Sequence, residues 1–149
     1  MPFAIRNATP EDAALLASLE SACFSEPWSE GAVAAHLASA QGYAKLAVMD
    51  DGTAVGYILG LLLGEEAELL RVAVLPAYRR IGIGWWLVDA FLLRLAGDGT
   101  RACFLEVRSS NVAARCLYES HGFLKVGMRK NYYKKPTEDA VVMRYDRKK

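Results

Sequence analysis

The sequence predicts an α/β fold of the mixed α+β type, with about seven strands in a single mixed sheet and four helices on its two faces. Short apolar runs of strand length alternate with longer helical segments, in the order strand, two helices, three strands, helix, strand, helix and two strands. The chain has 149 residues, of which 53% are hydrophobic, so it can bury a core of ordinary size. We therefore expect one domain that spans residues 1–149.

The first part of the chain predicts a short strand at residues 3–7, followed by two helices. Thr9-Pro10-Glu11-Asp12 has the features of a helix start. A hydroxyl can cap free amides, proline suits the first turn, and acidic residues favour the positive end of a helix. An apolar stripe continues this helix from Ala14 to Cys23. Pro27-Trp28-Ser29-Glu30 opens the second helix, which runs to Ala40.

The rest of the chain predicts a β-hairpin, a third strand and a second set of alternating elements. Residues 43–49 and 53–63 form the hairpin around the turn Asp50-Asp51-Gly52. Residues 67–75 form the next strand, which Pro76 ends. The remaining elements are the helix 82–96, the strand 103–107, a helix capped by Ser110 that ends at Ser120, and the strands 123–129 and 139–145 with a loop at 131–136.

Charge and composition argue against several function classes. The 18 basic and 17 acidic residues leave a net charge of +1, and such a balance does not indicate nucleic-acid or membrane binding. The 3 cysteines lack metal-ligand spacing and indicate a reducing compartment rather than a disulfide framework. No signal peptide or membrane-spanning run is visible, so we expect a cytoplasmic protein. His36 and His121 are isolated, so we expect surface or helix-end histidines and no metal site.

The first chemical motif is the turn Arg79-Arg80-Ile81-Gly82-Ile83-Gly84, between a predicted strand and a predicted helix. Glycine lets the backbone approach a ligand closely, and the first amides of a helix lack internal acceptors. Together with the positive end of the helix dipole, these amides form an anion site suited to a pyrophosphate. The two arginines can add charge-assisted contacts. The alternative is a glycine-rich helix start with two surface arginines.

A carboxylate and a phenol form the second motif. Burial disfavours the charged form of a carboxylate, so Glu106, in an apolar strand, is expected to accept a proton near neutral pH. The alternative is a sheet carboxylate that faces water or pairs with Arg71 or Arg108. Asn111 and Tyr118 share one face of the following helix, and the Tyr118 phenol could protonate a thiolate. The alternative is an aromatic core residue.

These groups match the needs of acetyl transfer to an amine, which are a neutral nucleophile, a polarised thioester carbonyl and a protonated leaving thiol. An α-amino group has a pKa of about 8, so a weak base helped by water suffices. The strand that ends at Pro76 could polarise the carbonyl through a backbone amide freed by a bulge.

In this order, the motifs resemble the GNAT superfamily of acetyltransferases. The resemblance extends to its RimI branch, which acetylates the N-terminal alanine of a small-subunit ribosomal protein. The glycine turn is similar to the coenzyme A signature of the superfamily. The stretch from Glu106 to Tyr118 and the stretch Asn131-Tyr132-Tyr133 are more specific to the branch. Further matching stretches are Pro27–Glu30, Val72–Val74 with Pro76, Gly122-Phe123, Arg129 and Glu138–Ala140.

The resemblance implies direct transfer from acetyl-coenzyme A to a protein N-terminus, with no metal. Glu106 would be the general base and Tyr118 the general acid, so Cys103 and Cys116 would be small buried hydrophobes rather than nucleophiles. Trp28, Tyr132 and Tyr133 would bind the acceptor. The residues implied to bind the coenzyme are Val72, Ala73, Val74, Arg79, Arg80, Ile81, Gly82, Ile83, Gly84, Trp85, Asn111 and Tyr118.

Two positions depart from the branch. Arg71 stands where asparagine is common, and Trp85-Trp86 follows the glycine turn where arginine or small residues are usual. Arg71 therefore puts the acceptor in question more than the coenzyme, while the two tryptophans either pack in the core or rest on the coenzyme. The alternatives to a protein N-terminal acetyltransferase are an enzyme that acts on a lysine or a small-molecule amine, and a non-catalytic module that binds acetyl-coenzyme A.

Overall fold

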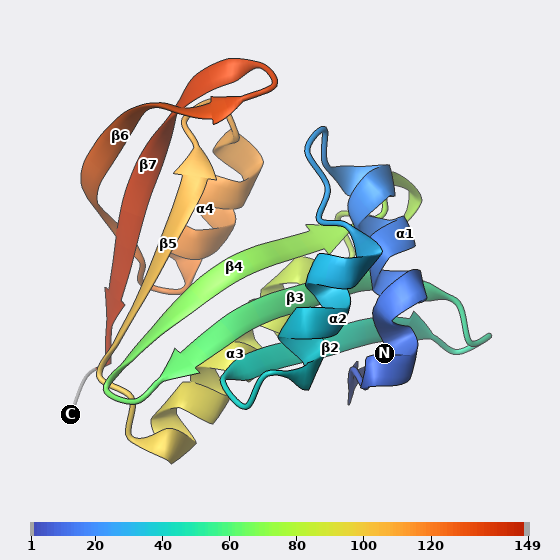
Figure 1. The fold of residues 1–149 in the computed structure, drawn as a ribbon. Helices are drawn as coiled ribbons and strands as arrows, with labels where there is room; N and C mark the ends of the chain where they lie inside the picture. The colour runs from blue at the N-terminus through green and yellow to red at the C-terminus, as the bar shows by residue number, and fades with distance from the viewer. Residues whose placement is uncertain (1, 148–149) are drawn as a thin grey trace.

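The computed structural model describes residues 2–147. Its elements follow the order that the sequence predicts and form a mixed sheet with helices on both faces (Figure 1). The strands are β1 (Phe3–Asn7), β2 (Gly42–Met49), β3 (Ala54–Leu63), β4 (Glu66–Val74), β5 (Ala102–Arg108), β6 (Leu124–Lys134) and β7 (Thr137–Asp146). The helices are α1 (Ala13–Cys23), α2 (Glu30–Ala38), α3 (Ile83–Asp98) and α4 (Val112–Ser120), with short 3-10 turns at Pro10–Asp12 and Pro76–Tyr78.

The sheet has the strand order β1-β2-β3-β4-β5-β7-β6. Every neighbouring pair is antiparallel except β4 and β5, which are parallel and pair only between Glu66–Glu68 and Ala102–Phe104. Beyond that short pairing the two strands separate, so the sheet opens between its two halves (Figure 1). This opening is the feature of the fold that positions the site.

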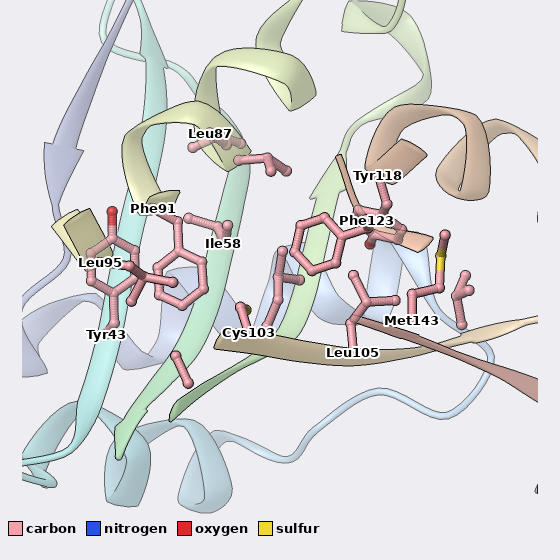
Figure 2. Close-up of a cluster of buried hydrophobic side chains, with 14 of the residues drawn as sticks. Tyr43, Ile58, Leu87, Phe91, Leu95, Cys103, Leu105, Tyr118, Phe123 and Met143 are labelled. Atoms are coloured by element: carbon pink, nitrogen blue, oxygen red, sulfur yellow. The ribbon is translucent and has the colours of Figure 1, made fainter. Parts of the chain in front are cut away.

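Two apolar clusters hold the helices against the sheet. One lies under α1 and α2 and includes Leu16, Val33 and Tyr57. The other lies under α3 and α4, and Figure 2 shows Phe91 of α3 and Leu105 of β5 within it. Within residues 2–147, no helix is long and apolar enough to cross a membrane.

Local signals explain most of the element boundaries. The Ser29 hydroxyl accepts the Ala32 N–H at 3.1 Å and caps α2, so this helix begins within the predicted stretch Pro27-Trp28-Ser29-Glu30. The Asp12 carboxylate accepts the Thr9 N–H at 2.8 Å, so the predicted helix start closes as a short 3-10 turn that runs into α1. Gly99, with φ of 74°, ends α3 in the left-handed region, where glycine carries no steric cost.

Two predictions about the C-terminal half were wrong. Asn111 rather than Ser110 caps α4, because its Oδ1 accepts the Ala114 N–H at 3.1 Å. The expected loop at residues 131–136 is largely strand, since β6 continues to Lys134 and β7 begins at Thr137. An irregularity between Arg129 and Tyr133 interrupts the pairing of this long hairpin. Pro136 is the one turn signal that the sequence offers in this stretch.

Candidate active site

A cleft of about 1290 Å³ opens where β4 and β5 separate. It collects side chains from both halves of the sheet, from the turn before α3, from α4 and from the segment between α1 and α2. Among the predicted site residues Ile81 is outside its lining and is 49% exposed. The predicted residues that line it are Trp28, Val72, Ala73, Val74, Arg79, Arg80, Gly82, Ile83, Gly84, Trp85, Glu106, Asn111, Tyr118, Tyr132 and Tyr133.

The edge of β4 offers free backbone groups to this cleft. Leu75 donates its N–H to the C=O of Val55 at 2.8 Å, which sets the alternation of hydrogen bonds to β3. Because an antiparallel strand uses alternate residues for one neighbour, the backbone groups of Val72 and Val74 point away from β3. The other neighbour, β5, pairs with β4 only as far as Glu68. The N–H and C=O of Val72 and the N–H of Val74 therefore face the cleft without a strand partner, and such groups can bind an extended polar chain.

The predicted bulge is present in the strand that ends at Pro76. Arg71 lies opposite Leu59 and Leu69 lies opposite Gly60, so Leu70 is the extra residue of β4. A bulge bends its strand and increases the local twist. It lies at the point where β4 turns away from β5.

The turn before α3 has the geometry of an anion site. Arg80 and Gly82 have positive φ values of 69° and 90°, in the left-handed region. Turns that alternate between hands aim successive N–H groups at one concave side, which binds anions. α3 begins at Ile83, so its first amides lack internal acceptors and add the positive end of the helix dipole. The Arg79 Nε donates to the C=O of Val74 at 2.8 Å, which joins this turn to the end of β4.

Trp85 and Trp86 are on the surface of α3 and not in the core, with exposures of 39% and 40%. Trp85 lines the cleft and stacks on the His121 ring, with centroids 4.7 Å apart. The His121 Nε2 lies 3.1 Å from the Trp85 carbonyl oxygen, and burial lowers the pKa of His121. Of the two alternatives for these tryptophans, packing in the core was therefore wrong, and contact with the coenzyme stays a prediction.

Glu106 lies on β5 at the wall of the cleft, and its surroundings differ from the prediction. Its side chain is 28% exposed rather than enclosed by apolar groups. Neither Arg71 nor Arg108 pairs with it. Instead Nη1 of Arg129 on β6 lies 3.2 Å and 3.1 Å from its two carboxylate oxygens. The carboxylate is therefore both accessible from the cleft and held in place by a neighbouring strand.

Tyr118 reaches the cleft from α4 and is 6% exposed. Burial, and after it the proximity of Tyr133, raises the pKa of Tyr118 well above the usual value of a phenol, so the hydroxyl keeps its proton at neutral pH. Its ring packs edge-on against Phe123 with centroids 5.9 Å apart. Tyr118 thus packs in the core with its ring and lines the cleft as well.

The hairpin β6–β7 contributes two aromatic side chains to the same cleft. Tyr132 is 41% exposed, and the central carbon of the Arg129 guanidinium lies 4.4 Å from the centre of its ring. The central carbon of the Arg108 guanidinium lies 4.4 Å from the centre of the Tyr133 ring. Burial, and then the charge of Glu106, raises the pKa of Tyr133 to about 12. The charge effect indicates that Tyr133 and Glu106 lie near one another.

Sequence reasoning missed a buried carboxylate behind the cleft. Glu20 is 0% exposed and accepts hydrogen bonds from the Tyr57 hydroxyl and, at 2.8 Å, from the Trp28 N–H. Nε of Arg71 lies 3.5 Å from the same carboxylate. A signal was available, because Glu20 follows Leu16 by one helical turn and so lies on the apolar face of α1, where a carboxylate needs partners.

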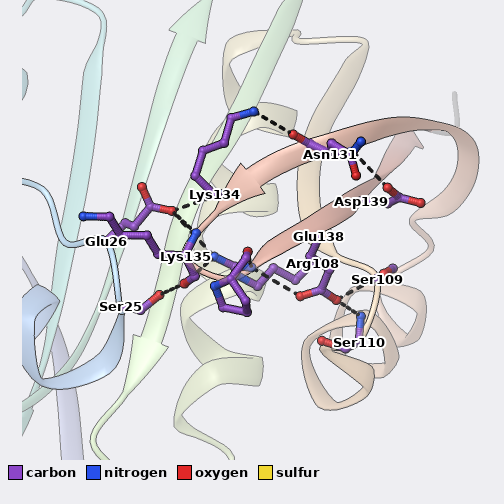
Figure 3. Close-up of polar contacts among 11 residues, drawn as sticks. Ser25, Glu26, Arg108, Ser109, Ser110, Asn131, Lys134, Lys135, Glu138 and Asp139 are labelled. Carbon is purple, nitrogen blue, oxygen red and sulfur yellow. Dashed lines mark hydrogen bonds and ion pairs between the residues drawn. The ribbon is translucent and has the colours of Figure 1, made fainter.

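A second carboxylate joins the α1–α2 segment to the tip of the hairpin across one end of the cleft (Figure 3). The Glu26 carboxylate accepts the N–H groups of Lys134 and Lys135 at 3.3 Å and 3.0 Å, and Arg108 lies 3.8 Å away. The Ser25 hydroxyl donates to the Lys135 carbonyl at 2.7 Å. These contacts fix the spacing between the two segments that contribute Trp28, Tyr132 and Tyr133.

Glu138 ties the start of β7 to the end of β5 (Figure 3). Its carboxylate accepts the Ser110 N–H at 2.6 Å and the Ser109 hydroxyl at 3.1 Å, and it pairs with Arg108 at 3.3 Å. The hydrogen bonds from Ser110, more than the other contacts, hold the pKa of Glu138 at about 2. The carboxylate is therefore ionised at neutral pH.

The cysteines and histidines lie partly where the sequence placed them. Cys103 is buried, which raises its pKa to about 12, but Cys116 is exposed and the prediction that it is a buried hydrophobe was wrong. His121 follows the end of α4 as expected. His36 also lies near a helix end, but it is buried and lies 3.0 Å from the Tyr43 carbonyl oxygen. Residues 2–147 contain no group of His, Cys, Asp and Glu side chains that could hold a metal ion.

Comparison with known proteins places this cleft in a known family. The model of the Acetyltransferase (GNAT) family matches residues 13–123. The chain is 39% identical over 122 residues to the [ribosomal protein bS18]-alanine N-acetyltransferase of Haemophilus influenzae, covering 78% of this chain and 80% of that protein. It is 38% identical over 151 residues to the N-alpha-acetyltransferase RimI of Mycobacterium tuberculosis, covering 97% and 93%.

A solved structure supports the same assignment. The crystal structure of the ribosomal-protein-S18-alanine N-acetyltransferase from Escherichia coli superposes with a TM-score of 0.89 at 30% identity, covering 97% of this chain and 93% of that one. The matched segment contains the opened strand β4, the anion turn and the helix that carries Tyr118. The chain therefore belongs to the Acetyltransferase (GNAT) family.

Proposed function

We propose that residues 1–149 form a single domain that transfers the acetyl group of acetyl-coenzyme A to the N-terminal α-amino group of a protein, an N-terminal alanine of a small-subunit ribosomal protein. The observation that carries this proposal is that Glu106 and Tyr118 line one cleft with the anion turn. The proteins of Haemophilus influenzae and Escherichia coli named above, whose names state the alanine of ribosomal protein S18 as the acceptor, support this choice.

The coenzyme would bind in the part of the cleft that is lined by β4 and the turn before α3. Its pyrophosphate would lie on the amides at the start of α3, beside Arg80 and Gly82. Its pantetheine would bind the N–H and C=O of Val72 and the N–H of Val74. The side-chain oxygen of Asn111 accepts the Ala114 N–H in the α4 cap, so any contact of this side chain with the coenzyme would use the amide nitrogen.

The chemistry proceeds in one direct transfer. Glu106, helped by water, takes one proton from the α-ammonium group, and the resulting neutral amine attacks the thioester carbonyl carbon and forms the C–N bond. The nitrogen then loses its second proton to water. The C–S bond then breaks, and Tyr118, which burial keeps protonated, gives its proton to the departing sulfur. Exchange with water returns both side chains to their starting states. Trp28, Tyr132 and Tyr133 would shape the groove for the acceptor chain.

Acceptor competition tests the proposal. The protein is given acetyl-coenzyme A with equal amounts of a peptide that begins Ala-Arg, the same peptide with a blocked N-terminus and one internal lysine, and a free small amine. The proposal expects acetylation of the free peptide N-terminus in large excess. Preference for the lysine or the small amine would overturn the choice of acceptor, and coenzyme binding without any transfer would overturn the enzymatic role.

A further inference from the structure

Arg71 is held rigidly at the wall of the cleft by three different groups. Its Nη2 donates to the Glu26 carbonyl at 2.9 Å, and its Nε lies 3.5 Å from the buried Glu20 carboxylate. Its guanidinium lies 4.1 Å from the centre of the Phe24 ring. A guanidinium fixed in this way loses little further freedom when it binds a ligand.

Part of this guanidinium remains available. Within residues 2–147, Nη1 of Arg71 has no hydrogen-bond partner, and it is not among the enclosed unpaired atoms. The side chain is 19% exposed and lines the cleft, so ligands in the cleft can reach it. Arginine has five N–H donors and no acceptor, so the free nitrogen suits a carbonyl or carboxylate oxygen.

The position of Arg71 is close to the reacting groups. It projects from β4, on the opposite side of the strand separation from Glu106 on β5. Its charge also acts on the Tyr118 and Tyr133 phenols, where it opposes the rise in pKa that burial causes. An acceptor whose amine lies between Glu106 and Tyr118 thus brings its next few atoms near Arg71.

We propose that Arg71 determines specificity for an α-amine by donating a hydrogen bond to the carbonyl oxygen of the first acceptor residue. In every peptide N-terminus the carbon of that carbonyl is two bonds from the α-amino nitrogen. A lysine ε-amine and a simple alkyl amine have no carbonyl at this separation, so they leave the donor unpaired. The inference rests on the proposed function and explains how the site tells a chain terminus from a side chain.

The test compares two acceptors that differ only at the first amide. One is a peptide beginning Ala-Arg, and the other replaces that amide by an (E)-alkene isostere, which keeps the shape and removes the carbonyl oxygen together with the N–H of the second residue. We expect kcat/KM to favour the amide by about tenfold or more in the natural protein, as for a hydrogen bond to a charged group. In Arg71→Met the ratio is expected to fall by about tenfold or more from its natural value, because the missing N–H and the changed amine pKa act on both proteins alike. The affinity for coenzyme A, measured by calorimetry, should not change.

Two further variants separate recognition from folding. Arg71→Lys keeps a cation beside Glu20 but lacks the planar fork, so it should fold even if Arg71→Met does not, and its ratio should also fall. Arg144→Met removes an arginine on β7 that faces Phe104 and does not line the cleft, and it should keep the natural ratio. An unchanged ratio in the folded Arg71 variants would overturn this inference alone. Failure to acetylate any peptide would overturn the proposed function as well.

Discussion

Replacing Glu106 by glutamine removes the proposed base and keeps its size. A positioned general base contributes about 10²- to 10⁴-fold to a rate, and we expect the low end here, a loss of about 10²-fold in kcat, because water can assist. The fold should tolerate the change. The Glu106–Arg129 pair is exposed, with side-chain exposures of 28% and 57%, and such pairs contribute about 0–1 kcal/mol.

The pH dependence gives the sharper result. An α-amino group with a pKa of about 8 is about one-tenth neutral near pH 7 and almost fully neutral near pH 9.5. If Glu106 removes the proton of the acceptor, the variant can use only amine that arrives neutral. Its shortfall against the natural protein should therefore shrink by about tenfold over this range.

Steady-state rates with saturating acetyl-coenzyme A and a peptide beginning Ala-Arg measure the effect at each pH. The matched control is Arg129→Gln, which breaks the same ion pair and keeps the carboxylate. We expect the control to lose less than about tenfold. Equal losses in the two variants would refute the role of Glu106 as a base and assign the effect to the ion pair.

Three other results follow from the same geometry. Tyr118→Phe should lower kcat by about 10²-fold, while calorimetry finds coenzyme affinity close to the natural value; full activity would exclude the phenol as the acid. Gly60→Ala should lower the free energy of unfolding by about 1–3 kcal/mol in denaturant melts, because a Cβ would lie 2.7 Å from the Phe91 ring; an unchanged midpoint would contradict this packing. The pKa of Glu138 is lower in the folded than in the unfolded protein, so its carboxylate stabilises the fold at any pH above the unfolded pKa of 4.5. Thermal stability should therefore fall as the pH drops from 4.5 to about 2, and Glu138→Gln should flatten that dependence.

The sequence predicts what depends on local signals. The start of α2 at Ser29 and the Gly82 turn are encoded within a few residues, and each is present. The bulge in β4 was inferred from the needs of the chemistry, and it is present as well. Glu106 and Tyr118 both line the cleft, and strand β5 and helix α4, which carry them, are consecutive in the chain. Their roles as base and acid stay predictions.

The groups that sequence reasoning missed come from distant segments. Arg129 on β6 reaches Glu106 on β5 across the intervening strand β7. This contact depends on the register between β6 and β7, which includes irregularities that no short motif marks. Glu20 meets Arg71 across the layer between α1 and β4. The cap of α4 was assigned to Ser110, but Asn111 provides it, and residue type alone does not decide between two neighbouring capping residues. The contact of Asn111 with the coenzyme stays a prediction.

The central claim is that this cleft acetylates a protein at its N-terminus. Small-subunit ribosomal proteins with free N-termini can be incubated with the protein and acetyl-coenzyme A, and the site of acetylation located by tandem mass spectrometry. The account predicts one acetyl group on the α-nitrogen of an N-terminal alanine, absent when Glu106→Gln replaces the natural protein under the same brief incubation. Acetyl groups found only on lysine side chains, or no transfer at all, would contradict it.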